Sequence, residues 1–133
     1  MSRVVNAMTI DVEDYFHVSA FEATVPRSRW DSLESRVVRN TDRLLDVFQT
    51  ADVRATFFML GWVAERHPSL VRRIAEAGHE LASHGFGHRL VYDQSPAEFR
   101  EDLFAKSPER LIGDDVHFGH PCAPAFTEES VCV

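Results

Sequence analysis

Residues 54–60 read RATFFML, a short and strongly apolar run that is followed by a glycine. This length and composition are typical of a fully buried β-strand and are too short for a buried helix. Two similar runs lie on either side. Residues 4–11 (VVNAMTID) end in an acid, and residues 79–83 (HELAS) are equally brief. We therefore predict three short strands.

Amphipathic segments separate these predicted strands. Over residues 35–50, apolar side chains recur on one side of a helical wheel and arginines lie around the rest. A second helix is predicted to begin at Pro68 and to be capped at its C-terminus by Gly78. The sequence SPAE, a capping box with proline at the first helical position, opens a third helix over residues 95–106. Residues 12–31 show no clear period and are predicted to form a long loop.

Alternation of strands and helices favours an α/β fold in which parallel strands are joined by right-handed crossovers. In such a fold the carboxyl ends of the strands meet at one edge of the sheet. Asp11, Glu13 and Asp14 lie at the end of the first predicted strand, and His84 and His88 follow the third. We expect these five side chains to lie in one neighbourhood.

Composition excludes several classes of protein. The chain has 133 residues, 44% hydrophobic and 26% charged, which suits one globular domain. Its 14 basic and 21 acidic residues give a net charge of -7, so we expect no nucleic-acid partner. No window reaches the roughly 18 consecutive apolar residues of a membrane span, and we expect a cytoplasmic protein. The spacing of Cys122 and Cys132 matches neither a disulfide framework nor a CxxC metal site, so free thiols are expected.

Two histidines are candidate metal ligands. His84 and His88 lie four residues apart in the sequence SHGFGH, a spacing that lets two imidazoles converge on one ion. Gly85 and Gly87 would let the backbone turn tightly and approach a bound group closely. A pair of surface histidines is the alternative interpretation.

Three carboxylates are crowded into four positions at the end of the first predicted strand. Mutual repulsion among Asp11, Glu13 and Asp14 is costly unless a cation or a proton relieves it. Loop acids that simply face water are the alternative. Combined with the two histidines, the acids complete a set of two histidines and one carboxylate with an acid to spare, which is what a hydrolytic metal centre needs.

Three motifs resemble a known family. TIDVED at residues 9–14, RATFFMLGW at 54–62 and AGHELASHGFGH at 77–88 resemble the first half of the polysaccharide deacetylase domain, also called the NodB-homology domain or carbohydrate esterase family 4. The resemblance extends over residues 4–103 and is greatest to the branch associated with exopolysaccharide synthesis and exosortase systems. It implies a distorted (β/α) barrel and an enzyme that removes acetyl groups from oligo- or polysaccharides.

The resemblance also implies roles for individual residues. Asp11 matches the general base, and His84 and His88 match the metal-binding histidines. The family has two adjacent aspartates where this chain has DVED, so Glu13 is the first choice for the carboxylate ligand and Asp14 the reserve. The implied chemistry is metal-assisted hydrolysis with a divalent cation, expected to be Zn²⁺, in which Asp11 takes a proton from the attacking water.

The chain departs from the family pattern after residue 107. Cys122 stands where the family has an arginine, and His117 and His120 are candidate acids by residue type alone. A complete barrel takes about 200 residues or more. We therefore expect an incomplete domain over residues 1–107, an irregular divergent tail over 108–133, weak or no activity, and self-association through unpaired sheet edges.

Two other functions stay open at this point. Related domains hydrolyse small cyclic amides, and a substrate that carries a carboxylate would favour that activity. A non-catalytic module that holds a metal or a partner through the exposed face is the other alternative. Tyr92 is an aromatic side chain that would either pack against a sugar ring or lie in the core.

Overall fold

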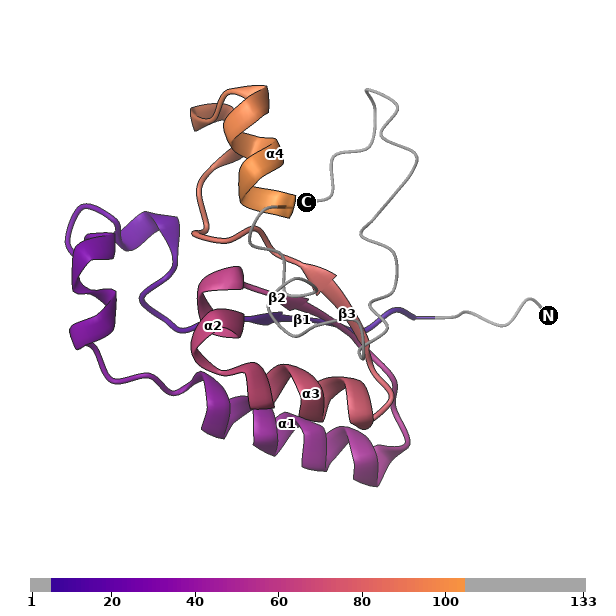
Figure 1. Ribbon diagram of the computed structural model, residues 1–133. Helices are drawn as coiled ribbons and strands as arrows, with labels where there is room; N and C mark the ends of the chain where they lie inside the picture. The colour runs from indigo at the N-terminus through magenta and orange to yellow at the C-terminus, as the bar shows by residue number, and fades with distance from the viewer. Residues whose placement is uncertain (1–5, 105–133) are drawn as a thin grey trace.

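The structure is a computed structural model that describes residues 6–104 (Figure 1). Its strands are β1 (Thr9–Val12), β2 (Thr56–Met59) and β3 (Glu80–Ser83). Its α-helices are α1 (Val37–Ala51), α2 (Gly61–Arg66), α3 (Pro68–Glu76) and α4 (Pro96–Phe104). Three short 3₁₀ helices, η1 (Ser19–Phe21), η2 (Arg27–Ser32) and η3 (Val91–Asp93), lie in the connecting loops. The predicted alternation of strands and helices is confirmed.

The three strands form one parallel sheet in the order β1-β2-β3, with Asp11 opposite Phe58 and Phe58 opposite Ala82. Figure 1 shows α1 and α3 below the same face of this sheet. Each new strand is added to the same edge of the sheet, and the helices that connect the strands lie on one face of it. This is the arrangement of a (β/α) barrel. Within the described part of the chain, β1 and β3 each pair on one side only. Self-association through these edges stays a prediction.

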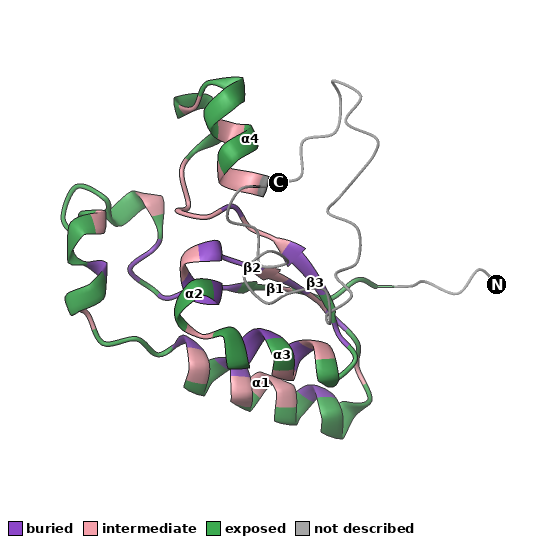
Figure 2. Ribbon diagram, viewed as in Figure 1, coloured by how far each residue is buried: buried purple, intermediate pink, exposed green. Residues whose placement is uncertain are grey.

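The core lies between the sheet and the two helices below it. Phe57 and Met59 of β2 and Leu81 of β3 are fully buried on this face. They pack with apolar side chains that α1, α2 and α3 supply: Val37, Phe48, Val63, Ala64, Leu70, Val71 and Ile74. Phe58, on the opposite face, is only partly buried. Figure 2 shows buried residues, in purple, in the sheet and in α1 and α3. The prediction that β2 is fully buried is therefore wrong, because helices cover one face of the sheet in the described structure.

Helix ends confirm the predicted caps. Gly78 follows the last residue of α3 by two positions and adopts a left-handed φ of 79°. Such a φ is unfavourable for residues that carry a Cβ atom, which explains the glycine. At the start of α4, the backbone N–H of Ser95 donates to the Glu98 carboxylate at 2.8 Å, and the Glu98 N–H donates to Ser95 Oγ at 3.3 Å. This is the predicted capping box.

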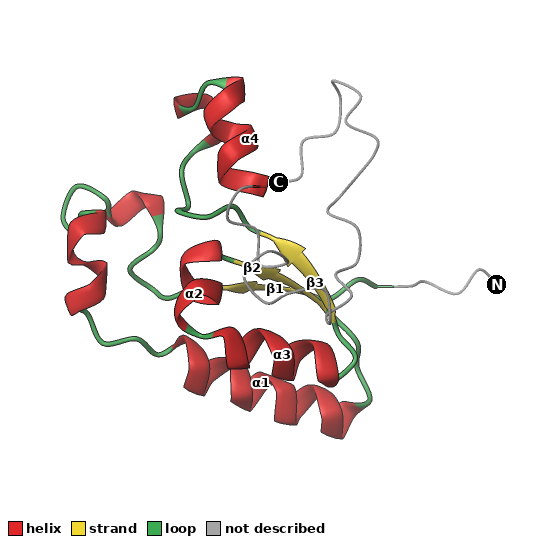
Figure 3. Cartoon of the chain, in the orientation of Figure 1, coloured by secondary structure: helices red, strands yellow, loops and turns green. Residues whose placement is uncertain are grey.

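Several boundaries differ from the predictions. β1 begins at Thr9 rather than at residue 4, because residues 6–8 are not part of the sheet. The predicted loop over residues 12–31 contains η1 and η2, and α2 directly follows β2 without having been predicted (Figure 3). Six residues are too few to show a helical period, which is why α2 gave no signal.

An aromatic cluster attaches the loop after β1 to α2. It consists of Phe16, His17, Trp30 and Trp62, whose ring centroids lie 4.4 to 6.3 Å apart. The edge-to-face contacts among these rings are favourable and bury Phe16, His17 and Trp30. The guanidinium of Arg66 lies 3.8 Å from the Trp62 ring centroid and donates to the Asp31 carboxylate. The loop is therefore a packed part of the fold.

His17 is expected to make stability depend on pH. Burial lowers its pKa from 6.5 to about 4, and the nearby His88 and Arg66 add to this while Asp14 opposes it. As the pH falls, the unfolded chain therefore binds a proton at His17 before the folded chain does. The stabilising contribution of neutral His17 is complete above pH 6.5 and is lost as the pH falls towards 4. At pH 5 the loss is about 2 kcal/mol in the free energy of unfolding, measurable by urea denaturation.

The matched variant is His17→Asn, whose amide oxygen can replace Nδ1 as the acceptor of the Asp14 N–H, a hydrogen bond of 2.8 Å. Burial also lowers the pKa values of His67 and His79, so part of the pH dependence is expected to survive in this variant. An identical pH dependence in both proteins would contradict the assignment to His17.

Within residues 6–104, no helix combines the length and apolar character needed to cross a bilayer. The interpretations that concern Cys122, Cys132, His117, His120 and the boundary at residues 107 and 108 lie outside the described residues.

Candidate metal centre

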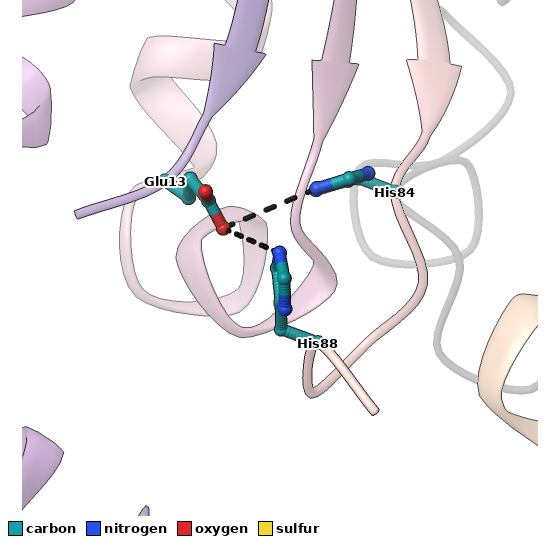
Figure 4. Close-up of side chains that lie close together, drawn as sticks. All are labelled: Glu13, His84 and His88. Carbon is teal, nitrogen blue, oxygen red and sulfur yellow. Dashed lines mark ion pairs between the residues drawn. The ribbon is translucent and has the colours of Figure 1, made fainter. Parts of the chain in front are cut away.

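Three of the predicted site residues converge at the carboxyl end of the sheet. Glu13 follows β1 directly, and His84 and His88 lie in the loop after β3. Glu13 Oε2 lies 3.1 Å from His88 Nε2 and 4.0 Å from His84 Nε2, and the two imidazole centroids are 5.0 Å apart (Figure 4). The three ligand atoms lie within 4.8 Å of one another. The fold therefore brings together residues that are about seventy positions apart in the sequence.

Two atoms of this group are buried without a hydrogen bond. Glu13 Oε2 and His84 Nε2 are shielded from solvent, and apart from the ion-pair contacts within this group no described residue forms a hydrogen bond with either atom. An unsatisfied buried polar atom costs about 1–3 kcal/mol, which a cation bound between the three side chains would offset. Two imidazole nitrogens and one carboxylate oxygen are ligands that Zn²⁺ prefers in catalytic sites. The donor set thus fits a divalent cation.

The electrostatics of Glu13 are consistent with such a cation. Burial raises the pKa of its carboxyl, and the charge of Asp11 raises it further, while His88 and His84 oppose the rise. Burial raises the pKa because the charged carboxylate loses hydration, which costs free energy. A positive ion beside Glu13 would remove that cost.

Asp11 lies near this group without belonging to it. It occupies the sheet face opposite the helices, where its side chain is exposed. Side chains two residues apart share a face of a strand, so Asp11 and Glu13 project in the same general direction. Its charge acts on Glu13, but it is not one of the three clustered ligands. Its role as general base stays a prediction.

Asp14 lies with a different part of the molecule. Its side chain is only 3% exposed, and its two oxygens accept hydrogen bonds from Ser35 Oγ at 2.6 Å and from the Arg36 N–H at 2.8 Å. Both partners precede α1 directly, so the carboxylate satisfies a donor beside the start of that helix. The structure therefore groups Glu13, and not Asp14, with the two histidines.

His88 is held by two residues of the loop after β1. Ser19 Oγ lies 3.1 Å from His88 Nδ1, and the Arg27 guanidinium donates to the His88 carbonyl at 3.4 Å. A neutral imidazole that offers Nε2 to a metal carries its proton on Nδ1, so Nδ1 would donate to Ser19 Oγ. Sequence reasoning missed both residues, since the loop carries no periodic pattern.

Comparison with known proteins identifies the family. The polysaccharide deacetylase family model matches residues 29–111, more than half of the chain, and this range includes both histidines. The chain belongs to the polysaccharide deacetylase family. Its resemblance to the exopolysaccharide branch in particular is not tested by this match.

Individual relatives agree with the family. This polysaccharide deacetylase family member is 36% identical over 84 residues to a peptidoglycan-N-acetylglucosamine deacetylase of Bacillus cereus, an alignment that covers 61% of the chain and 30% of the relative. It is 40% identical over 86 residues to such an enzyme of Listeria monocytogenes, covering 65% of the chain and 18% of the relative. The chain thus spans less than a third of the length of these two relatives.

A solved structure supports the fold. The crystal structure of a peptidoglycan N-acetylglucosamine deacetylase matches with a TM-score of 0.56 and 29% identity, over 80% of this chain and 38% of that one. The predicted fold class, a partial NodB-type arrangement of parallel strands and helices, is therefore confirmed for this member of the polysaccharide deacetylase family.

The two glycines of the family motif have different roles here. Gly85 has a φ of 70°, and a Cβ atom on it would lie 2.5 Å from an oxygen of Asp102. Gly87 has no positive φ, and a Cβ atom there would meet nothing within 4 Å. The predicted tight turn is confirmed at Gly85, whereas Gly87 has no positive φ. A close approach of these glycines to a bound group stays a prediction. His88 itself has a φ of 51°, which completes the turn that brings the two rings together.

Tyr92 lies in η3, four residues after the second histidine, and is 81% exposed. The alternative that it belongs to the core is therefore wrong. Packing of its ring against a sugar stays a prediction for this polysaccharide deacetylase family member.

Proposed function

We propose that this chain carries the metal centre of a hydrolase that removes acetyl groups from N-acetylated glycans. The observation that supports the proposal most directly is the convergence of Glu13, His84 and His88, with two of their buried polar atoms lacking a hydrogen bond. Membership of the polysaccharide deacetylase family agrees with this chemistry.

Each residue of the site has a role in the proposal. Glu13, His84 and His88 would hold a divalent cation, proposed to be Zn²⁺, and three protein ligands leave further positions open. When bound, Zn²⁺ polarises a carbonyl and lowers the pKa of a water to about 7. Asp11 accepts the proton of the attacking water, since its exposed carboxylate lies beside the ligands at the open face of the sheet. The amide C–N bond breaks as its nitrogen takes up a proton, which Asp11 returns directly or through solvent, and acetate and a free amine leave.

The relatives and the motifs together support the substrate that we propose. Two similar proteins are described as peptidoglycan-N-acetylglucosamine deacetylases, which favours a polymer that contains N-acetylglucosamine. The motifs around residues 9–14 and 77–88 resemble the exopolysaccharide branch, so we propose an N-acetylated exopolysaccharide as the polymer.

Acetate release tests the proposal. We expect the 133-residue chain to bind one Zn²⁺ per monomer and to release acetate slowly from an N-acetylated chitooligosaccharide, and we expect a chelator to stop the release. Asp11→Asn is the control: it should bind Zn²⁺ like the wild type and release acetate about 100-fold more slowly.

Other outcomes identify the alternatives. Zn²⁺ binding without acetate release would favour a non-catalytic metal-binding module. Hydrolysis of a small cyclic amide, such as a hydantoin, without action on the glycan would favour a cyclic amide hydrolase. A chain that binds no Zn²⁺ would contradict the proposal as a whole.

A further inference from the structure

The backbone between the two histidines is held by a carboxylate from α4. We call residues 84–88 the histidine loop. The Phe86 N–H donates to Asp102 Oδ2 at 3.2 Å, and the Gly87 N–H donates to Asp102 Oδ1 at 3.4 Å. Each carboxylate oxygen thus accepts one amide from the middle of the loop. Hydrogen bonds to a charged acceptor are about twice as strong as those between neutral groups.

The opposite side of the same loop is held by α2. The Gly61 N–H donates to the Gly85 carbonyl at 2.8 Å, and the Trp62 N–H donates to the Phe86 carbonyl at 3.0 Å. The carbonyls of the histidine loop are therefore held by α2, and its amides are held by Asp102 of α4. The separation of the two imidazoles depends on this pair of anchors, because His84 and His88 are the ends of the segment that they hold.

Glycine at position 85 fits this arrangement. A Cβ atom there would lie 2.5 Å from Asp102 Oδ2, which is closer than real Cβ contacts. The carboxylate can reach the loop amides only because position 85 carries no side chain. The glycine at position 85 thus leaves the space that the Asp102 carboxylate occupies, although the two residues lie in different elements.

α4 makes few other contacts with the described body of the protein. From Pro96 to Leu103 no residue is buried, and Figure 2 shows the helix largely exposed. Its other polar contact with the described body is an exposed ion pair between Arg89 and Glu98 at 3.5 Å. Exposed ion pairs contribute about 0–1 kcal/mol. The contact of α4 with the histidine loop is therefore its main polar connection to the described sheet.

We infer that Asp102 is a positioning residue of the metal centre, which holds His84 and His88 at the spacing that the ion requires. This inference rests on the proposed function and extends it, because it adds a residue of α4 to the site. Asp102 acts through the loop amides and does not contact the ligand atoms themselves. Removal of residues that orient metal ligands lowers metal affinity by about 10- to 100-fold.

The test compares Asp102→Ala with Glu101→Ala, a neighbouring exposed acid whose loss changes the net charge equally. Zn²⁺ affinity is measured by competition with a chromophoric chelator. We expect the affinity of Asp102→Ala to be about 10- to 100-fold weaker and that of Glu101→Ala to stay within twofold of the wild type. Asp102→Asn, which keeps one acceptor oxygen, should fall between them.

Hydrogen exchange separates this inference from the proposed function. In the metal-free chain, the amides of Phe86 and Gly87 should exchange faster in Asp102→Ala than in the wild type. The inference requires both the faster exchange and the weaker Zn²⁺ affinity, and either change without the other overturns it. If the wild type binds no Zn²⁺, the proposed function fails, and the exchange rates alone then decide whether Asp102 holds the loop.

Discussion

Replacement of one ligand of the metal centre is expected to abolish Zn²⁺ binding at micromolar protein. Structural zinc sites with four ligands bind with about 10–16 kcal/mol, or about 3 kcal/mol per ligand. Loss of one ligand therefore weakens binding by about 100- to 1,000-fold. Glu13→Gln, His84→Ala and His88→Ala should each lower the metal content from one Zn²⁺ per monomer to near zero, as measured by elemental analysis after gel filtration.

Glu34→Gln is the matched control for Glu13→Gln. Glu34 is exposed, and its ion pair with Arg36 has an N···O distance of 3.7 Å, so its loss should leave the metal content unchanged. Unfolding is measured in a chelator to separate folding from binding. Without metal, Glu13→Gln removes a buried charge and should not destabilise the fold. Wild-type metal content in all three ligand variants would exclude this site.

Replacement of Asp14 is expected to have the opposite result. Asp14→Ala leaves Ser35 Oγ and the Arg36 N–H without their acceptor beside the start of α1. Hydrogen bonds to a charged group contribute about 1.5–3 kcal/mol each, and a helix-capping group contributes about 0.5–2 kcal/mol. We expect the free energy of unfolding to fall by about 2–4 kcal/mol, measured by urea denaturation in a chelator.

The metal content of the Asp14 variants shows whether Asp14 stabilises the fold or binds the metal. Asp14→Ala and the milder Asp14→Asn should still bind one Zn²⁺ per monomer under conditions where they are folded. Asp14→Asn keeps an oxygen that can accept from the Arg36 N–H, so its stability loss should be smaller. Loss of Zn²⁺ from Asp14→Asn at unchanged stability would show that Asp14, rather than Glu13, is the carboxylate ligand.

Local sequence patterns predicted most of the regular structure. Strands β2 and β3 and helices α1 and α3 have periods or lengths that identify them, and Gly78 and the SPAE motif mark helix ends. α2 and the 3₁₀ helices were not predicted, because three to six residues show no period. The aromatic cluster was also missed, since its members are distant in sequence and are joined only by packing.

The ligand set could be predicted in part. The spacing of His84 and His88, and the two-residue separation of Glu13 from Asp11 along a strand, indicate the three residues that the structure groups together, because both depend on local backbone geometry. Ser19 and Asp102 belong to segments without a distinctive motif, so no local pattern indicates that they contact the histidine loop.

By itself, the sequence determined that parallel strands alternate with helices and that acids and histidines end two of the strands, since both properties depend on short-range order along the chain. Only the tertiary structure decided which carboxylate joins the histidines and what holds the loop between them. Those outcomes depend on hydrogen bonds between segments that are distant in the chain. The Asp14 carboxylate accepts hydrogen bonds from Ser35 Oγ and the Arg36 N–H, whereas the Glu13 carboxylate lies beside the two imidazoles.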